Sequence, residues 1–305
     1  MDIIFGVLRY IVIYNVGYVV DMDSSRGYIC SDQNIQFAYF YGMNLLLKKY
    51  SVFLLFLSFN VSTFSQEINS SFKEGEWFEF RIYYGIFNAS YASIELSRDT
   101  LKKIPVFHAK GYGRTTGLAR LFFKVEDYYE SFFTPQKISP IRFIRDIYEG
   151  GYTKNVEILF DHEKKFAHVT DKKKNKKNTF PIEENAQDLI SAFYYLRNFY
   201  PKGKVRKNES FNINMFFDNE NYVFKLKYLG KQILRTKIGK IKCLKFRPFV
   251  QSERIFREQE SVTLWISDDL NKIPVRLQAD LLIGSIKADL ENYKNLKHPL
   301  ILKFD

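Results

Sequence analysis

Residues 77–84 read WFEFRIYY, and this short stretch indicates the fold class. Phe78, Phe80 and Ile82 stand at every second position, and charged residues such as Glu79 separate them. Such alternation places apolar side chains on one face of a β-strand and polar side chains on the other. The stretch therefore predicts a half-buried strand at the start of a β-rich domain.

The same alternation recurs outward from this strand to the end of the chain. Turn residues such as Asn219, Gly230 and Gly284 separate the alternating runs. We expect further strands at residues 89–96, 106–112, 127–133, 141–149, 155–160, 165–170, 211–217, 222–229, 232–237, 240–249, 261–266, 274–282 and 285–293. Many short strands joined by tight turns are typical of antiparallel sheets.

One segment departs from this pattern. Residues 185–197 read NAQDLISAFYYLR, in which Leu189 and Phe193 fall on one apolar face at helical spacing. Asn185 is the expected N-cap, and a second short helix is expected over residues 118–123. An apolar helix in a β-rich chain needs a surface to cover it. We therefore expect a mainly β protein whose antiparallel strands form a strongly curved sheet or a half-barrel or barrel-like architecture, with one or two short helices. The longer helix is expected to fill the concave side of the sheet.

The segment at residues 43–66, MNLLLKKYSVFLLFLSFNVSTFSQ, has the pattern of a secretory signal. Lys48 and Lys49 precede a short apolar core, and small residues precede the expected cleavage after Ser65. The apolar core is shorter than the ~20 residues that span a bilayer. We therefore expect a signal peptide at residues 43–65 and an exported mature chain.

The remaining boundaries follow from this signal. Residues 1–42 are expected to come from an over-extended gene start, because a signal belongs at the N-terminus. The alternative is a transmembrane segment at residues 3–20, which Arg9 and Asn15 interrupt. Residues 66–305 are expected to form a single β-rich domain. No cysteine stands at the cleavage site, so we expect location in the periplasm or outer cell envelope without a lipoprotein anchor.

Composition limits the class of protein further. The chain has 305 residues, 17% aromatic residues and 2 cysteines, which excludes collagen-like, disulfide-rich and wholly disordered classes. Cys243 remains after cleavage and is expected to be a buried, small apolar residue. The net charge of +12 would suit nucleic acid, but export from the cytoplasm argues against that partner.

Two stretches carry a resemblance to a known family. One is DLISAFYYLR at residues 188–197, and the other is LWISDDLNKIPV at 264–275, followed by GSIKADL at 284–290. With FKEGE at residues 72–76, they resemble the domain of unknown function family 3108 over most of the chain after the signal. Members of that family are exported proteins, common in Bacteroidetes and Proteobacteria, with no established activity. The resemblance implies a β-rich envelope protein and no particular chemistry, and a distant likeness to half-barrel lipoprotein carriers is analogy alone.

Carboxylates near these motifs are the candidates for chemistry. Asp268 and Asp269 follow Ser267 in an expected turn, where both carboxylates could reach one site and act on a glycan. The alternative is a hairpin turn in which Ser267 and Asp268 bond to backbone amides. Asp188 either stabilises the first turn of the helix or acts as a base. Arg197 either pairs with such an acid or interacts with the carbonyls at its own helix C-terminus.

Aromatic residues are the stronger lead for binding. Phe193 and Tyr194 on the expected helix belong to a set that either fills the core or lines a concave cavity for an acyl chain. Trp265 is expected on a strand that is covered on both faces, with Leu264 and Ile266 on the opposite face from the indole.

Two further motifs have ordinary explanations. The run DKKKNKK at residues 171–177 is expected to be a solvated hairpin tip, or else a contact for anionic lipid head groups. His162 and His168 flank a hairpin without the spacing of metal ligands, so we expect no metal site and no cofactor.

These features favour a non-enzymatic exported envelope protein that binds or carries a hydrophobic, lipid-like ligand. In this interpretation the curved sheet holds the ligand, the helix covers it and a basic rim meets anionic lipid. The alternatives are a glycan-directed hydrolase that uses the turn carboxylates and a structural partner of an envelope protein complex. A continuous apolar cavity would favour the first hypothesis, converging carboxylates the second, and an exposed apolar patch the third.

Overall fold

The computed structural model describes residues 71–199, 205–252, 255–257 and 262–303. These residues belong to one compact unit of the chain. The predicted signal peptide at residues 43–65, its cleavage site after Ser65 and the preceding residues 1–42 lie outside the described residues.

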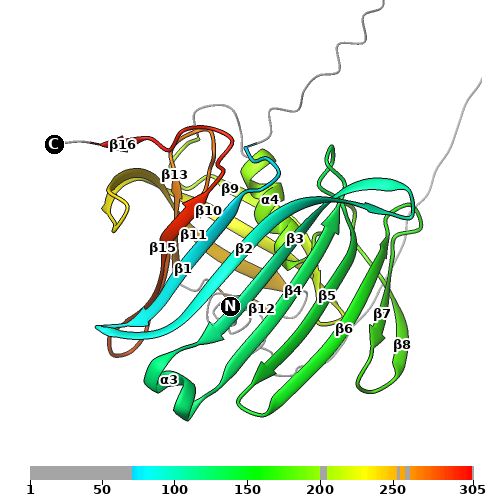
Figure 1. The fold of residues 1–305 in the computed structure, drawn as a ribbon. Coiled ribbons are helices and arrows are strands. Elements are labelled where there is room, and N and C mark those ends of the chain that lie inside the picture. The colour runs from blue at the N-terminus through cyan, green and yellow to red at the C-terminus, as the bar shows by residue number, and fades with distance from the viewer. Residues whose placement is uncertain (1–70, 200–204, 253–254, 258–261, 304–305) are drawn as a thin grey trace, which may run out of the picture. The chain divides into compact units, whose positions relative to one another are not determined.

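The described residues form one antiparallel sheet and two short helices (Figure 1). The first strands are β1 (Trp77–Tyr84), β2 (Phe87–Leu101), β3 (Ile104–Thr115), β4 (Val125–Phe133), β5 (Pro140–Glu149), β6 (Tyr152–Asp161), β7 (Phe166–Asp171) and β8 (Lys176–Pro181). The later strands are β9 (Ser210–Phe217), β10 (Glu220–Arg235), β11 (Lys240–Ser252), β12 (Ile255–Arg257), β13 (Val262–Ser267), β14 (Pro274–Asp280), β15 (Ser285–Lys294) and β16 (Leu302–Lys303). The helices are α3 (Gly117–Phe122) and α4 (Leu189–Phe199). Across the sheet the order is β8-β7-β6-β5-β4-β3-β2-β1-β15-β14-β13-β11-β10-β9, and β12 and β16 pair with β11.

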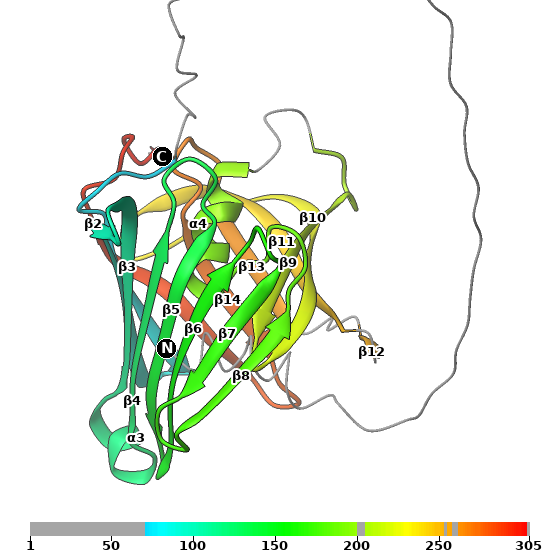
Figure 2. The ribbon, with the colours of Figure 1, turned by 90° about the vertical axis from the view of Figure 1, so that its right-hand side faces the viewer.

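The expected mainly β, antiparallel and strongly curved architecture is confirmed. The sheet curves round α4, so that its edge strands β8 and β9 approach each other (Figure 2). The rings of Phe180 in β8 and Phe216 in β9 lie 6.0 Å apart, centroid to centroid. Gln187, in the connection to α4, forms a parallel bridge with Met215 of β9. No ladder joins β8 to β9 among the described residues, so the sheet is barrel-like but open.

The expected turn at Gly230 is wrong, because β10 runs through this position as one strand of 16 residues. The pairing of β10 with β11 shifts register between Tyr228 and Gly230. Gly230 has a φ of +129°, which residues with a side chain rarely adopt. Glycine therefore permits a β-bulge here, and the local turn signal marks that bulge rather than the end of a strand.

The expected helix is present but begins later than its sequence suggests. Asn185 has a φ of 57° and lies outside α4, so it is not the N-cap. Asp188 takes that role, since its Oδ1 accepts hydrogen bonds from the backbone N–H groups of Ile190 at 2.8 Å and Ser191 at 2.7 Å. The short second helix is confirmed as α3, and none of its residues is buried.

The main core lies between one side of α4 and the concave face of the first strands. Ile190 and Tyr194 of α4 are fully buried. The Tyr194 ring packs against Phe72 and Phe133, with ring centroids 4.8 Å and 5.3 Å apart. Aromatic rings contribute large buried areas to a core. Part of the aromatic surplus of the chain is therefore core packing.

Candidate functional site

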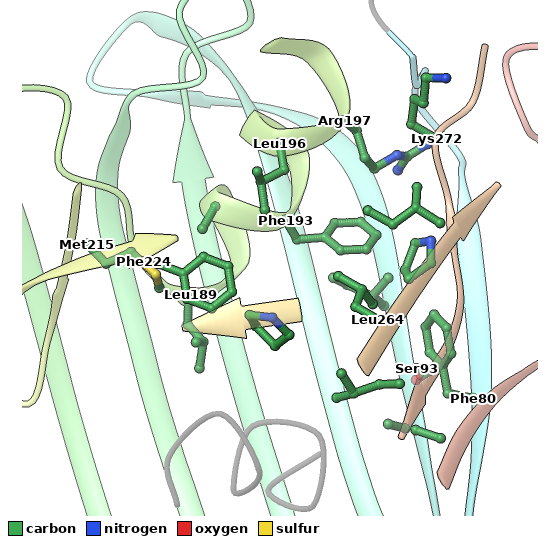
Figure 3. A pocket seen from close by; sticks show the side chains of 18 residues that line it. Phe80, Ser93, Leu189, Phe193, Leu196, Arg197, Met215, Phe224, Leu264 and Lys272 are labelled. Carbon is green, nitrogen blue, oxygen red and sulfur yellow. The ribbon is translucent and has the colours of Figure 1, made fainter. Parts of the chain in front are cut away.

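A cavity of about 160 Å³ lies between α4 and the concave face of β1, β2, β9 to β11 and β13 to β15 (Figure 3). All of its lining residues are apolar except Ser93, Arg197 and Lys272. Figure 3 shows the Phe193 side chain pointing from α4 toward Leu264 of β13. The arrangement can hold an apolar group, because most of its wall offers no hydrogen bond.

Small side chains in the wall leave this space open. Ala92 of β2, Ala192 of α4 and Ala288 of β15 all line the cavity. An engineered apolar cavity of ~150 Å³ stays free of water and accepts a benzene-sized molecule. The cavity beside α4 has a similar volume and a similar lining, so it is suited to an apolar ring or a short hydrocarbon segment.

Arg197 and Lys272 lie at one end of the cavity (Figure 3). The Arg197 guanidinium forms a buried, bidentate ion pair with Glu76, in which Nη2 donates to Oε2 at 2.8 Å. Its Nε also donates to the Asn271 carbonyl at 3.0 Å, and Nη2 donates to the Ser71 carbonyl at 3.0 Å. Each guanidinium nitrogen thus has a partner within the protein. Arg197 therefore anchors the C-terminal end of α4 instead of offering free donors to a ligand.

This anchor joins the stretches that carry the family resemblance. Glu76 closes the FKEGE stretch, Arg197 ends DLISAFYYLR, and Asn271 lies within LWISDDLNKIPV. The rings of Phe72 and Phe78 flank the guanidinium at 5.4 Å and 5.3 Å, within the range of cation–π attraction. Sequence reasoning missed the role of Glu76, although that residue stands in one of the quoted stretches.

Ser267, Asp268 and Asp269 lie at the end of β13 and in the connection to β14. Asp269 Oδ1 accepts a hydrogen bond from the Ser267 hydroxyl at 2.7 Å. Asp268 forms ion pairs with Lys231 at 2.8 Å and Lys242 at 3.3 Å. Burial alone would raise the pKa of Asp268, but the hydrogen bonds from the two lysines outweigh it and hold that pKa below its ordinary value. The adjacent carboxylates therefore serve different partners. The hairpin-turn alternative is right for Ser267, whose Oγ accepts a hydrogen bond from the Ile273 N–H at 2.9 Å. It is wrong for Asp268, because Asp269 Oδ1 accepts the backbone N–H groups of Asn271 and Lys272 instead.

Asp188 is fully buried at the start of α4. Its Oδ2 accepts a hydrogen bond from the Ser131 hydroxyl of β4 at 2.6 Å. Burial raises the pKa of Asp188 from 3.8 to about 6, although hydrogen bonds from Ser131 and the first turn of α4 oppose this rise. The partners of Asp188 lie on β4 and α4, whereas those of Asp268 lie on β10 and β11. These carboxylates therefore do not share a site.

Trp265 lies on the face of β13 that points away from the cavity. Its indole is buried in a cluster with Cys243, which Leu302 covers. Leu264 and Ile266 point to the opposite face and line the cavity. The strand is therefore covered on both faces, as its sequence predicts, and Cys243 is buried as expected.

The structure separates the predicted aromatic residues of α4. Phe193 lines the cavity, whereas Tyr194 points into the packed core. The Tyr194 hydroxyl is buried without a hydrogen-bond partner among the described residues, and burial raises its pKa well above the ordinary value. Sequence reasoning did not identify Met215 and Lys272 as lining residues, because no local pattern marks them.

The histidines near the β6–β7 hairpin have separate partners. His162 bonds to the Pro140 carbonyl at 2.8 Å and His168 to the Thr179 hydroxyl at 3.0 Å. Within the described residues, no group of three or more His, Cys, Asp and Glu side chains is placed to hold a metal ion. In that same part of the chain, no helix has the length and apolarity needed to cross a membrane.

Comparisons with other proteins show which family the chain belongs to. A crystal structure of a beta-barrel-like protein of domain of unknown function DUF1849 from Brucella abortus is 9% identical, with a TM-score of 0.47, and the match covers 74% of this chain and 99% of that chain. A DUF1089 family protein from Pseudomonas aeruginosa is 11% identical, with a TM-score of 0.30, over 72% of this chain and 97% of that chain. No curated protein sequence matches the chain. A family model described as "Protein of unknown function (DUF3108)" matches residues 79–291. This match spans most of the chain, including the α4 and β13–β15 motifs, and the chain therefore belongs to the DUF3108 family.

Proposed function

We propose that the protein is exported and binds a hydrophobic, lipid-like molecule in the cavity beside α4, without catalysing a reaction. The cavity carries this proposal, since it has a volume of about 160 Å³ and an almost wholly apolar lining. Protein interiors are otherwise packed as densely as organic crystals, so a space of this size is a feature that needs an explanation. The signal pattern at residues 43–65 supports export.

The size of the cavity limits the ligand. Because its volume is close to that of a cavity that accepts benzene, the cavity fits a ring or a short segment of an acyl chain, and not an entire phospholipid. Because Glu76 and backbone carbonyls already satisfy Arg197, shape and apolar contact would select the ligand. The hydrolase alternative has less support, since Asp188 is buried as a helix cap and Asp268 is paired with lysines.

Thermal melting of Phe193→Ala, with and without a fatty acid, tests the proposal. The substitution enlarges the cavity and lowers stability, and a ligand that binds only the folded protein restores part of that loss by mass action. A fatty acid at 100 times its Kd would add about 2.7 kcal/mol. That corresponds to a rise of roughly 5–10 °C in Tm for a domain of this size.

Phe143→Ala is the matched control. Phe143 is a buried phenylalanine of β5 that does not line the cavity. This variant should lose stability and show the same fatty-acid shift as the native protein. Absence of any lipid-dependent shift in both the native protein and Phe193→Ala would contradict the proposal. If the fatty-acid shift is found, native mass spectrometry of protein purified from its own host would identify the molecule that is bound there.

A further inference from the structure

The most exposed apolar side chains of the described residues gather in a few connections. Each large apolar side chain in this part of the chain with an exposed fraction of at least 70% lies in the β1–β2 turn, in α3 or in the β14–β15 turn. We call this set the apolar tip, and it comprises Ile86 (91%), Leu118 (70%), Leu121 (80%), Phe122 (87%), Leu282 (102%) and Ile283 (77%).

The sheet topology brings these connections to one end of the molecule's sheet. The strands β15, β1, β2, β3 and β4 are consecutive neighbours, and each pair is antiparallel. Their connections through the turns and α3 therefore lie side by side at the end where β1 finishes (Figure 1). The Tyr84 hydroxyl donates to the Ile283 carbonyl at 2.7 Å, which ties the β1–β2 turn to the β14–β15 turn.

A basic hairpin lies at the same end. β7 runs in the same direction as β1, β3 and β5, so its turn to β8 stands at the end that carries the apolar tip (Figure 2). We call residues 172–177, which comprise this turn and the first two residues of β8, the lysine hairpin. Lys173, Lys174, Lys176 and Lys177 are exposed, and no ion pair joins their side chains to a carboxylate in the described residues. Apolar side chains and unpaired positive charge thus project from one end of the sheet.

The inner face of β1 leads from the apolar tip to the cavity. Phe80 lines the cavity, and Ile82 and Tyr84 follow on the same face toward the β1–β2 turn. In β15, Ala288 lines the cavity and pairs with Ile82. At a rise of about 3.3 Å per residue, the four steps from Phe80 to Tyr84 cover roughly 13 Å. An apolar row of this length connects the cavity with the tip.

We propose that this end of the sheet docks on an anionic phospholipid bilayer, with the apolar tip inserted at the headgroup level and the lysine hairpin against the negative surface. Charge complementarity selects this partner over an apolar protein groove, because the lysines project from the same end of the sheet as the apolar tip. The inserted residues come from separate turns, which suits a fluid surface better than a fixed one. Interfacial segments of membrane-binding proteins combine basic and apolar residues in this way. Their apolar side chains insert ~5–10 Å into the boundary between headgroups and acyl chains. The surface does not depend on a ligand in the cavity.

Flotation with phosphatidylcholine vesicles, with and without phosphatidylglycerol, tests the docking surface. Leu121→Asp with Phe122→Asp should reduce binding to the anionic vesicles on the order of tenfold or more, because two inserted apolar groups become charged. These side chains are exposed, so the variants should fold. Leu270→Asp is the matched control: Leu270 is 66% exposed in the β13–β14 connection, at the opposite end of the sheet, and its replacement should leave binding unchanged.

Substitutions in the lysine hairpin separate charge from insertion. Lys173→Gln with Lys174→Gln should weaken binding to the anionic vesicles and remove much of its salt dependence. Lys102→Gln with Lys103→Gln, in the β2–β3 turn at the opposite end, should have no such effect. Equal binding by the native protein and the tip variants would overturn the proposal. A second outcome would also overturn it: the tip variants lose self-association while their vesicle binding stays unchanged. That outcome would assign the surface to contact between copies of the chain. The fatty-acid shift of Phe193→Ala reports on the cavity separately from either result.

Discussion

The side of α4 that carries Ile190 and Tyr194 packs against aromatic residues such as Phe133, whereas the side that carries Ala192 and Phe193 faces the cavity. Both sides belong to the same helix and lie under the same curved sheet. They differ in the residues that meet them, since the packed side contacts large rings and the cavity wall contains alanines. Small side chains in the cavity wall thus accompany the space that remains beside α4.

The largest expected effect on the free energy of unfolding comes from the ion pair between Arg197 and Glu76, which anchors the end of α4. Arg197→Met leaves the Glu76 carboxylate buried without its partner, and removal of one member of a buried pair costs about 3–5 kcal/mol. Urea unfolding should show this loss. The double variant Arg197→Met with Glu76→Leu should recover part of it, because apolar replacements of buried pairs are often tolerated. A double variant as unstable as Arg197→Met would contradict this explanation.

Trp265→Ala tests whether the cavity responds separately from the packing around it, because this substitution removes a large side chain from the face of β13 that points away from the cavity. The indole is buried on the other face of β13, and its Nε1 donates to Gln232 Oε1 at 2.9 Å. Loss of a buried tryptophan costs about 3–5 kcal/mol, so the melting temperature should fall clearly. The fatty-acid shift should match that of the native protein. An unchanged melting temperature together with lost ligand binding would make Trp265 a binding residue instead.

Asp188 makes the packed side of α4 sensitive to pH. Burial raises its pKa in the folded protein to about 6, so between pH 4 and 6 the folded state retains a proton that the unfolded state releases. This group therefore lowers stability as pH rises through that window, by about 2–3 kcal/mol in all, and leaves stability unaffected below the unfolded pKa.

Asp188→Asn removes this ionisation and keeps an oxygen that can cap the helix. Urea unfolding at pH 4 and pH 7 should show a smaller fall in stability for the variant than for the native protein. Asp146→Asn, at an exposed position of β5, is the control for the change from Asp to Asn itself. The same pH dependence in the native protein and Asp188→Asn would contradict the assignment.

Local patterns in the sequence predict most of the strands, although not β8, β12 and β16, but they do not predict which distant residues meet at the site. The alternation of Phe78 and Phe80 depends on neighbours in the chain, so one sequence is enough to detect it. Glu76 and Arg197 are 121 positions apart, and no local pattern pairs them. The sequence places the helix N-cap at Asn185, whereas the folded chain uses Asp188, because Asn and Asp are both good caps and only the hydrogen bonds of the folded chain decide between them.

The sequence offers an apolar cavity beside the helix only as the alternative to a filled core, and it does not indicate the apolar tip. A small residue such as Ala92 gives no sign of whether its neighbours fill the space beside it. The helix at residues 118–123 is expected from the sequence, but nothing in the sequence indicates that its apolar side chains are exposed.

The smallest expected effect on stability comes from filling the cavity with a side chain. Ala192 lines the cavity, so Ala192→Leu should place its added carbons in the open space. Cavity-filling substitutions commonly change stability by only about +0.5–2 kcal/mol. The added side chain occupies part of the volume that a ligand would use. Ala192→Leu should therefore reduce or abolish the fatty-acid shift while the melting temperature stays the same or rises slightly.

Ala109→Leu is the corresponding change on the packed side. Ala109 of β3 is fully buried in the main core, where no comparable space is present to receive the added carbons. Overpacking of a filled core costs about 1–3 kcal/mol, so this variant should melt at a lower temperature and keep its fatty-acid shift. The two alanine variants thus have opposite expected effects on stability and on ligand response. If Ala192→Leu destabilises the protein as much as Ala109→Leu does, the two sides of α4 are equally packed in solution and the cavity is not open to a ligand.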